Sequence, residues 1–283
     1  MFTITKSRQV EQIYRGQKTS EGAGVQLTRL FSSNLQRRLD PFLMLDNFAS
    51  DNPDDYIAGF PDHPHRGFET VTYMIEGRML HRDSKGNEGL LENGGVQWMT
   101  AGSGLVHSEI PQQEDGTMSG FQLWLNLAAA DKMSKPWYKD YQNADLPKYT
   151  TDEGVAITVI AGRSNGTEGA VQRDKTEPLY LDVHVPAGKS FSTAIPANHN
   201  AFIVVYEGQV ELSGTTIEAT QLALLANDAD VDGVHLTATD DSRVLILAGK
   251  PLNEPIVQHG PFVMNSREEI VAAFNDFQAG KFA

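Results

Sequence analysis

Short runs of β-branched and aromatic residues recur along the chain, and turns rich in Gly, Asn and Asp separate them. Runs of this kind predict β-strands, because branched and aromatic side chains pack well on a pleated surface. Their regular spacing is typical of a β-sandwich or a closed barrel, so the pattern predicts an all-β fold. The clearest predicted strands are Glu69–Ile75, Phe121–Leu127, Val155–Ile160, Tyr180–Val185, Phe202–Tyr206 and Val244–Leu247.

The clearest helical pattern lies near the C-terminus. Ser266 followed by Glu269 forms a capping box, in which two side chains satisfy backbone amides at the start of a helix. Gly280 supplies the stop. We predict a short packing helix whose apolar stripe, at helical spacing, consists of Ile270, Ala273, Phe274 and Phe277.

The chain has 283 residues, which is too long for one ordinary core and suits two domains. Between residues 128 and 150 charge, two prolines and the loss of strand alternation indicate a linker. We therefore predict an N-terminal domain over residues 1–135, a linker over 136–150 and a C-terminal domain over 151–283.

The two halves resemble each other. Val71–Gly77 (VTYMIEG) matches Phe202–Gly208 (FIVVYEG) at an offset of 131, with an apolar strand that ends in Glu-Gly in both. Gln97–Met99 corresponds to Ala223–Leu225 at an offset of 126. A duplicated β-barrel explains this similarity better than chance does.

Composition narrows the functional classes. Hydrophobic residues make up 40% of the chain and charged residues 21%, as in ordinary globular proteins. The net charge of −14 argues against direct binding of nucleic acid, which requires Lys and Arg to neutralise phosphates. Neither a secretory signal nor a stretch of roughly 20 apolar residues is evident. We expect a soluble, cytoplasmic and monomeric protein.

Two histidines stand two residues apart in the segment Asp62–Glu69. In an extended strand such residues point to one face, so His63 and His65 project together. If the register continues beyond Gly67, the same face also carries Glu69, Val71, Tyr73 and Ile75, and the opposite face carries Thr70 and Thr72.

A second pair with the same spacing, His107 and Glu109, follows about forty residues later. Gly102 and Gly104 precede it and allow a tight turn that brings this strand across the first. Three imidazoles and one carboxylate would leave two open positions on a six-coordinate ion. The chain has no cysteine, so only imidazole and oxygen ligands are available; these suit Fe, Mn, Ni, Cu, Co or Zn. His81, close to Asp83, is predicted to be a turn or rim residue.

The second half carries no comparable set. The offset of 131 places Ala194 and Pro196 at the positions of His63 and His65, and the offset of 126 places Gly233 opposite His107. We therefore predict that the C-terminal domain has no metal site.

Several segments resemble the signature of the pirin family. They are His63–Val71 (HPHRGFETV), Gln97–Gly102 (QWMTAG) and His107–Glu109 (HSE), with Asp40–Phe48 (DPFLMLDNF) before them and Gln258–Asn265 (QHGPFVMN) near the end. The resemblance implies a bicupin, that is, two cupin-type jelly-roll barrels in one chain.

The resemblance also implies one metal, usually iron, in the N-terminal cupin. It maps the ligands onto His63, His65, His107 and Glu109. The general cupin motif would instead select Glu69, so Glu69 stays open as the rival carboxylate. Asp46 and Gln122 are expected near the mouth of the site by the same resemblance.

Pirin-like proteins include members that oxidise the flavonol quercetin with molecular oxygen. The resemblance therefore implies a quercetin 2,3-dioxygenase that uses Fe(II), a small aromatic substrate and oxygen, with Glu109 as both ligand and proton acceptor. Two alternatives remain. One is a redox-sensitive metal-binding regulator that acts through partner proteins, and the other is a metal-free storage or scaffold cupin.

Overall fold

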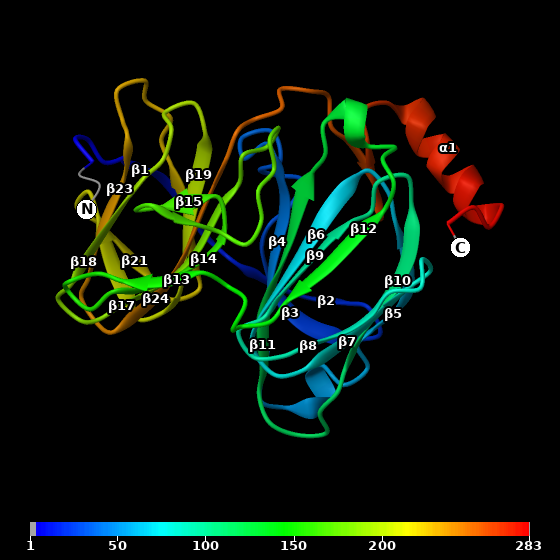
Figure 1. The fold of residues 1–283 in the computed structure, drawn as a ribbon, viewed down its shortest axis with the longest axis horizontal. Helices are drawn as coiled ribbons and strands as arrows, with labels where there is room; N and C mark the ends of the chain where they lie inside the picture. The colour runs from blue at the N-terminus through cyan, green and yellow to red at the C-terminus, as the bar shows by residue number, and fades with distance from the viewer. Residues whose placement is uncertain (1–3, 283) are drawn as a thin grey trace. The chain divides into compact units, whose positions relative to one another are not determined.

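The computed structural model describes residues 4–282, and these residues fold into two compact units. The N-terminal jelly roll comprises residues 17–37, 41–143 and 252–282, and the C-terminal jelly roll comprises residues 4–16, 38–40 and 144–251. Each end of the chain therefore folds with the unit built by the opposite half. Figure 1 shows this exchange by colour, with a blue strand among yellow ones and the red helix beside cyan strands.

The N-terminal jelly roll contains a seven-stranded and a four-stranded antiparallel sheet. The larger sheet has the order β12 (Trp137–Tyr141), β9 (Val96–Thr100), β6 (Phe68–Glu76), β11 (Met118–Asn126), β4 (Phe42–Ser50), β3 (Val25–Phe31) and β2 (Gln17–Glu21). The smaller sheet has the order β5 (Phe60–His65), β10 (Leu105–Pro111), β7 (Met79–Asp83) and β8 (Glu88–Leu91).

The C-terminal jelly roll repeats this arrangement. Its larger sheet has the order β1 (Val10–Arg15), β22 (Gln221–Leu225), β19 (Asn200–Glu207), β24 (Ser242–Gly249), β17 (Leu179–Val185), β14 (Ala156–Ala161) and β13 (Lys148–Thr150). Its smaller sheet has the order β18 (Ser190–Ala194), β23 (Gly233–Ala238), β20 (Gln209–Leu212) and β21 (Thr215–Glu218), and a separate two-stranded ribbon joins β15 (Arg163–Ser164) to β16 (Thr167–Glu168).

The pairing registers agree with the internal duplication found in the sequence. Val71 on β6 pairs with Trp98 on β9, and the residues at the two offsets, Phe202 and Leu224, pair with each other on β19 and β22. The predicted all-β fold with two jelly-roll domains is confirmed, and each of the six predicted strands overlaps a strand of the structure.

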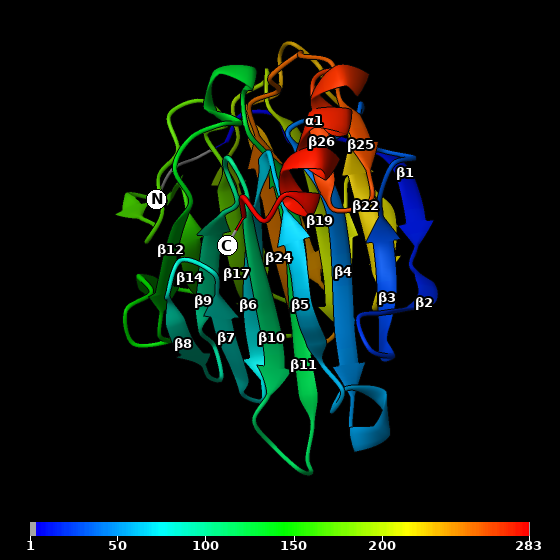
Figure 2. The same cartoon turned by 90° about the vertical axis from the view of Figure 1, so that its right-hand side faces the viewer.

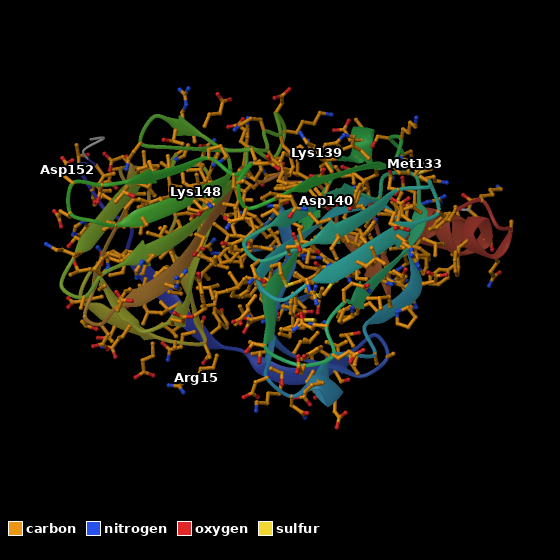
Figure 3. The ribbon with its side chains drawn as sticks, turned by 60° about the horizontal axis from the view of Figure 1, so that its bottom comes forward. Arg15, Met133, Lys139, Asp140, Lys148 and Asp152 are labelled. Atoms are coloured by element: carbon orange, nitrogen blue, oxygen red, sulfur yellow. The ribbon has the colours of Figure 1, made fainter. Side chains whose placement is uncertain are left out.

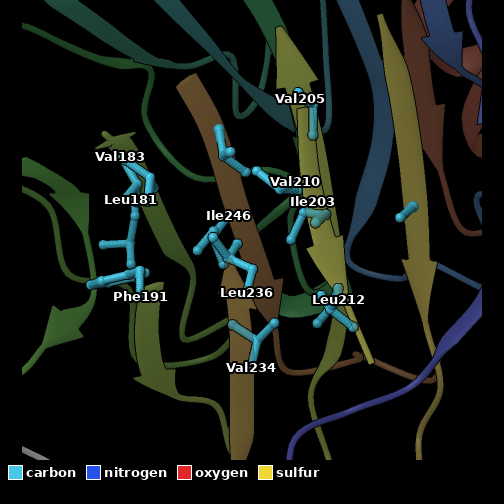
Figure 4. Packing of buried hydrophobic residues seen from close by; sticks show 14 of the residues in the cluster. Leu181, Val183, Phe191, Ile203, Val205, Val210, Leu212, Val234, Leu236 and Ile246 are labelled. Carbon is cyan, nitrogen blue, oxygen red and sulfur yellow. The ribbon is translucent and has the colours of Figure 1, made fainter. Parts of the chain in front are cut away.

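The interior of the C-terminal jelly roll is filled with aliphatic side chains. Branched residues from the large and the small sheet meet in one cluster, as Figure 4 shows. Among them, Ile203 and Ile246 come from the large sheet, and Val210 and Leu236 from the small one, and each is fully buried or nearly so. Burying such a side chain contributes about 1.5–3 kcal/mol, so this unit is stabilised as an ordinary closed core.

The interior of the N-terminal jelly roll is packed less completely. A smaller apolar cluster, which includes Phe48, Met74 and Met79, fills one part of the space between its sheets. The remainder carries buried polar side chains, among them His65, His107 and Glu109. The interior of this unit therefore includes a region with buried imidazole and carboxylate side chains.

The C-terminal segment packs on the N-terminal jelly roll. It forms the hairpin β25 (Val257–His259) and β26 (Phe262–Met264), followed by α1 (Arg267–Gln278), which lies in front of the hairpin in Figure 2. The predicted capping box is confirmed, because the Ser266 hydroxyl accepts from the Glu269 amide and the Glu269 carboxylate accepts from the Ser266 amide. No helix in residues 4–282 is long and apolar enough to cross a membrane.

The segment predicted to be a linker contains ordered strands. Its first part forms β12 at the edge of the N-terminal sheet, and its end forms β13 at the edge of the C-terminal sheet. Lys139 and Asp140 on β12 and Lys148 on β13 are labelled in Figure 3. Two 3-10 turns, Pro53–Asp55 and Ala129–Asp131, complete the elements.

Lys132, just before β12, is almost completely buried at 1% exposure. Its ammonium donates to the Gly67 carbonyl at 2.8 Å, the Asn126 side-chain oxygen at 2.6 Å and the Val263 carbonyl at 2.9 Å. A buried ammonium needs such acceptors, because an unpaired buried charge is very costly. Lys132 therefore ties the turn at Gly67 to β11 and β26.

We expect Lys132→Met to lower the free energy of unfolding by about 3 kcal/mol, because three buried oxygens would lose their donor. Urea unfolding of the purified protein measures this change. Lys135→Met, at an exposed position of the same segment, serves as the control and should change stability by less than about 0.5 kcal/mol. Equal effects of the two substitutions would contradict the role of Lys132.

Candidate metal centre

Two neighbouring strands of the small sheet carry the candidate ligands. β5 and β10 pair antiparallel, with His63 opposite His107 and His65 opposite Leu105. Alternate residues of a strand share a face, so His63 and His65 point together into the jelly roll, where His107 meets them. The three imidazoles, which the sequence analysis proposed as ligands from two distant segments, lie together in the structure.

The three imidazoles lie close enough to bind one ion. One nitrogen from each ring can be chosen so that all three atoms lie within 4.8 Å of one another. Ring centroids are 4.3 Å apart for His63 and His107, 4.7 Å for His63 and His65, and 5.0 Å for His65 and His107. His65 and His107 are buried and His63 is half-buried.

The outer nitrogen of each ring is already engaged. Nδ1 of His63 lies 2.8 Å from the Pro61 carbonyl, and Nδ1 of His65 lies 3.4 Å from the Pro261 carbonyl. Nδ1 of His107 lies 3.4 Å from Nδ1 of His81. A carbonyl oxygen can only accept a hydrogen bond, so these contacts place the ring proton of His63 and His65 on Nδ1. Nε2 of each ring then carries the lone pair.

Nε2 of His107 is buried and has no hydrogen-bond partner among the described residues. A buried polar atom without a partner is costly, unless a ligand satisfies it. The orphaned Nε2, together with the free Nε2 atoms of the other two rings, fits a divalent metal ion. The donor set therefore matches the imidazole site predicted from the sequence.

Burial favours the neutral form of the two buried imidazoles, His65 and His107. It lowers the pKa of His65 well below the usual 6.5, and the charge of His63 adds to the effect. Burial likewise lowers the pKa of His107, with further contributions from His63, His65 and His81. Neutral imidazole is the form that binds metals. Both imidazoles are therefore in the form that can bind a metal at neutral pH and below it.

Glu109 lies on the same cavity as His63 and His65. Its carboxylate is within hydrogen-bond reach of the Thr72 hydroxyl at 3.0 Å and of the Gln122 amide at 3.4 Å. The cavity has a volume of about 670 Å³, which falls within the range of small-molecule sites, about 300–1,000 Å³. A carboxylate on its wall can accept a proton from a bound ligand or coordinate an ion.

The cavity wall combines apolar and polar side chains. Trp124 packs edge-on against His65 at a centroid distance of 5.2 Å. Arg29 forms a two-pronged ion pair with Asp46, at 2.9 and 2.8 Å, and burial raises the pKa of Asp46 although Arg29 opposes it. The apolar members of the wall include Leu27, Met44, Phe48, Phe60, Met79 and Trp124, and the polar ones include Glu21, Arg29, Asp46, Thr72, Gln122 and Gln258.

Glu69, the rival carboxylate, does not line this cavity. Its side chain accepts a hydrogen bond of 2.6 Å from the Thr100 hydroxyl, its pairing partner on β9. The expectation that the register continues from His65 to Glu69 is wrong, because β5 and β6 belong to different sheets. As a result Thr72, expected on the opposite face, lines the cavity.

Gly67 makes the turn between these two strands. Its φ is +88°, and a β-carbon there would lie 2.0 Å from the Val263 carbonyl oxygen. Only glycine adopts this conformation without strain and also tolerates so close a backbone. Gly67 thus reverses the alternation between His65 and Glu69, which the two-residue periodicity alone does not show.

The structure adds residues that the sequence reading did not assign to the site. Pro261, from the C-terminal segment, supplies the carbonyl behind His65, and Thr72 reaches Glu109. The prediction of His81 as a turn or rim residue is wrong, because its side chain is fully buried against His107. His81 and Asp83 are two residues apart, like His63 and His65. This spacing was the sequence feature that could have indicated that His81 points into the jelly roll.

Comparison with known proteins identifies the family. Residues 24–125 match the Pirin family, and residues 180–283 match the Pirin C-terminal cupin domain. The chain belongs to the pirin family. The resemblance stated from the His63–Glu109 motifs is thereby confirmed, together with the bicupin architecture that it implied.

Relatives and solved structures resemble the chain over most of its length. A Pseudomonas aeruginosa protein named as a candidate quercetin 2,3-dioxygenase is 50% identical, over 99% of this chain and 100% of its own. A solved structure described as quercetin 2,3-dioxygenase from Acinetobacter baumannii has 35% identity and a TM-score of 0.91, covering 98% and 99% of the two chains. A bacterial pirin from Escherichia coli, solved in complex with nickel(II), shares the fold at 19% identity and a TM-score of 0.66, covering 85% and 99%.

The equivalent place in the C-terminal jelly roll carries no imidazole pair. Ala194 on β18 pairs with Gly233 on β23, as His63 pairs with His107 in the N-terminal unit. The space beside them is filled by the apolar cluster that includes Phe191 and Leu236. Within residues 4–282, the group of three possible ligand side chains found is the one in the N-terminal pirin domain.

Metal-free protein should lose stability as the pH falls below about 6.5. Unfolded histidine titrates near that value, whereas burial holds the pKa of folded His65 and His107 well below it. Below pH 6.5 the unfolded chain therefore binds protons that the folded chain does not. Each of these histidines lowers the free energy of unfolding by up to about 1.4 kcal/mol per pH unit, until its folded-state pKa is reached.

Urea unfolding of chelator-treated protein between pH 7 and 5 measures this dependence. His107→Leu removes one titrating group, so its stability should fall less steeply with acid than that of the wild type. The control, His235→Leu, changes an exposed histidine of the C-terminal jelly roll and should keep the wild-type slope. Identical slopes for His107→Leu and the wild type would contradict the prediction.

Proposed function

We propose that the protein is an iron-dependent dioxygenase that cleaves a flavonol of the quercetin type with molecular oxygen. The observation that carries this proposal is the convergence of three imidazoles, two of which, His63 and His65, line a cavity large enough for a small aromatic molecule. The names of a 50% identical relative and of a 35% identical solved structure support the same activity.

The proposed ligands are His63, His65, His107 and Glu109. Glu109 is favoured over Glu69 because it lines the cavity beside the imidazoles, whereas Glu69 is engaged by Thr100. Three imidazoles with one carboxylate suit iron among the first-row metals, and Zn, Mn, Ni, Cu and Co are the alternatives. When bound, the metal supplies Lewis-acid stabilisation of a deprotonated substrate oxygen and a place to orient oxygen.

The chain's own residues would bind and orient the substrate. Trp124 and the methionines of the wall offer an apolar surface for an aromatic ring, which excludes water from the reacting part. Glu109 would accept the proton of a substrate hydroxyl at its carboxylate. Thr72 and Gln122 hold that carboxylate in place through their hydrogen bonds.

The polar part of the cavity lies at the Arg29–Asp46 ion pair. Arg29 also contacts Glu21 at 3.0 Å, so its guanidinium is held by two carboxylates and is 25% exposed. We propose that this ion pair, with Gln122 and Gln258, binds hydroxyl groups of the flavonol. Polar groups placed in this way fix the orientation of a ligand in a mostly apolar site.

Glu109→Gln should weaken Fe(II) binding by about 10-fold or more, since it removes an anionic ligand and the proton acceptor. Glu69→Gln should leave Fe(II) affinity within about 2-fold of the wild type, because Glu69 faces Thr100 instead of the cavity. Anaerobic Fe(II) titration of both variants measures the difference. The reverse order of effects would make Glu69 the ligand.

Iron-loaded protein should consume oxygen when quercetin is added, and His63→Ala should abolish the uptake because it removes a proposed ligand. An oxygen electrode measures the rate, and product analysis establishes where the ring is cleaved. A wild-type protein that binds iron tightly, yet takes up no more oxygen than His63→Ala, would rule out the dioxygenase and favour the redox-sensitive regulator.

A further inference from the structure

A second histidine lies directly behind His107, outside the proposed ligand set. His81 on β7 is fully buried, and its Nδ1 lies 3.4 Å from Nδ1 of His107. On its other side, Nε2 of His81 lies 3.4 Å from an oxygen of Asp83, whose side chain is 1% exposed. The three side chains form a buried row, the Asp83–His81–His107 relay. The row ends at Nε2 of His107, which has no hydrogen-bond partner among the described residues.

The chemistry of the three groups determines which nitrogen of each ring donates a hydrogen bond and which accepts one. The Asp83 carboxylate can only accept, so Nε2 of His81 carries the proton. In its neutral form His81 then has an acceptor at Nδ1, and the contact with His107 requires a proton on Nδ1 of His107. Neutral His107 consequently presents a lone pair at Nε2, towards His63 and His65.

Both members of the row behind His107 are themselves held in place. The Asp83 carboxylate accepts from the backbone amides of Lys85 and Asn87, at 2.9 and 3.0 Å, and from the Asn87 side chain at 2.8 Å. The ring of His81 stacks on Tyr138 at a centroid distance of 4.4 Å and an interplanar angle of 18°. Neither ring nor carboxylate is free to turn away.

The C-terminal jelly roll offers an internal comparison. Its strand β20, at the sheet position of β7, has the sequence QVEL and ends in buried Leu212. The unit that has Ala194 and Gly233 in place of His63 and His107 therefore also has no histidine or aspartate behind them. The candidate ligands and the relay occur together in the N-terminal jelly roll, and both are missing from the equivalent strands of the C-terminal jelly roll.

We infer that His81 is a positioning residue, which Asp83 orients and which locks His107 in the tautomer that presents Nε2 to the metal. The inference deepens the proposed function, because it assigns the outer support of one of the proposed ligands. Groups that hold a metal-binding histidine through its second nitrogen typically contribute 10–100-fold to metal affinity.

Histidine tautomers in metal-free protein test the relay without any bound metal. In a long-range ¹H–¹⁵N spectrum of protein labelled on histidine nitrogens, His81 should be protonated on Nε2 and His107 on Nδ1. Substitution of each histidine in turn assigns the signals. A wild-type spectrum in which His107 carries its proton on Nε2 would overturn the inference, whatever the variants do.

Two substitutions at His81 separate the hydrogen bond from packing. His81→Leu removes the acceptor, so His107 should become a mixture of tautomers and Co(II) affinity should fall 10–100-fold. His81→Asn keeps an acceptor oxygen at the place of Nδ1, so it should retain the Nδ1–H tautomer and most of the affinity. Equal behaviour of both variants would reduce His81 to a packing residue and overturn the proposal.

The control variant and the Co(II)-binding measurement keep this test separate from the test of the proposed function. His235→Leu, in the other jelly roll, should leave both the His107 tautomer and Co(II) affinity unchanged. Wild-type protein that shows the expected tautomers but binds no Co(II) would refute the metal site and leave the relay intact. Wild-type protein that binds Co(II) with the opposite tautomer would refute the relay alone.

Discussion

The antiparallel pairing of β5 with β10 is the constraint on which the candidate site depends. It places His63 directly opposite His107 and brings His65 alongside, so that nitrogens from residues more than forty positions apart lie within 4.8 Å. A slip of one residue would turn the β10 side chains to the other face and remove His107 from the group. β5 then leads through the turn at Gly67 into β6 of the larger sheet, where a β-carbon would lie 2.0 Å from the Val263 carbonyl oxygen.

The two jelly rolls show how one topology serves two purposes. In the C-terminal unit, the space between the sheets is filled by a continuous aliphatic cluster, which gives a stable core. In the N-terminal unit, part of that space is given to imidazoles, a carboxylate and an ion pair. Buried polar groups cost free energy unless they are paired, and here nearly every one has a partner. Nε2 of His107 is one buried atom that has no hydrogen-bond partner among the described residues.

The C-terminal segment packs against the strand that carries His65. Arg66, next to His65, pairs with Asp276 on α1 at 2.9 Å and lies over the ring of Phe282 at 4.6 Å. The Pro261 carbonyl contacts His65 itself. Segments two hundred residues from the ligands thus fix the orientation of one ligand and of the strand that bears it. Buried Lys132 joins the same region by bonding to the backbone beside Gly67 and in β26.

The sequence alone determined the fold class, the duplication, the capped helix and the three imidazoles. These depend on short-range periodicity and on the match of two motifs, which a linear chain displays directly. Tertiary structure decided which carboxylate shares the cavity, because the turn at Gly67 moves Glu69 into another sheet. It also decided the place of His81, which looks like a hairpin residue until β7 pairs with β10. The exchange of chain ends between the jelly rolls was likewise hidden, because strand pairing over two hundred residues leaves no local pattern.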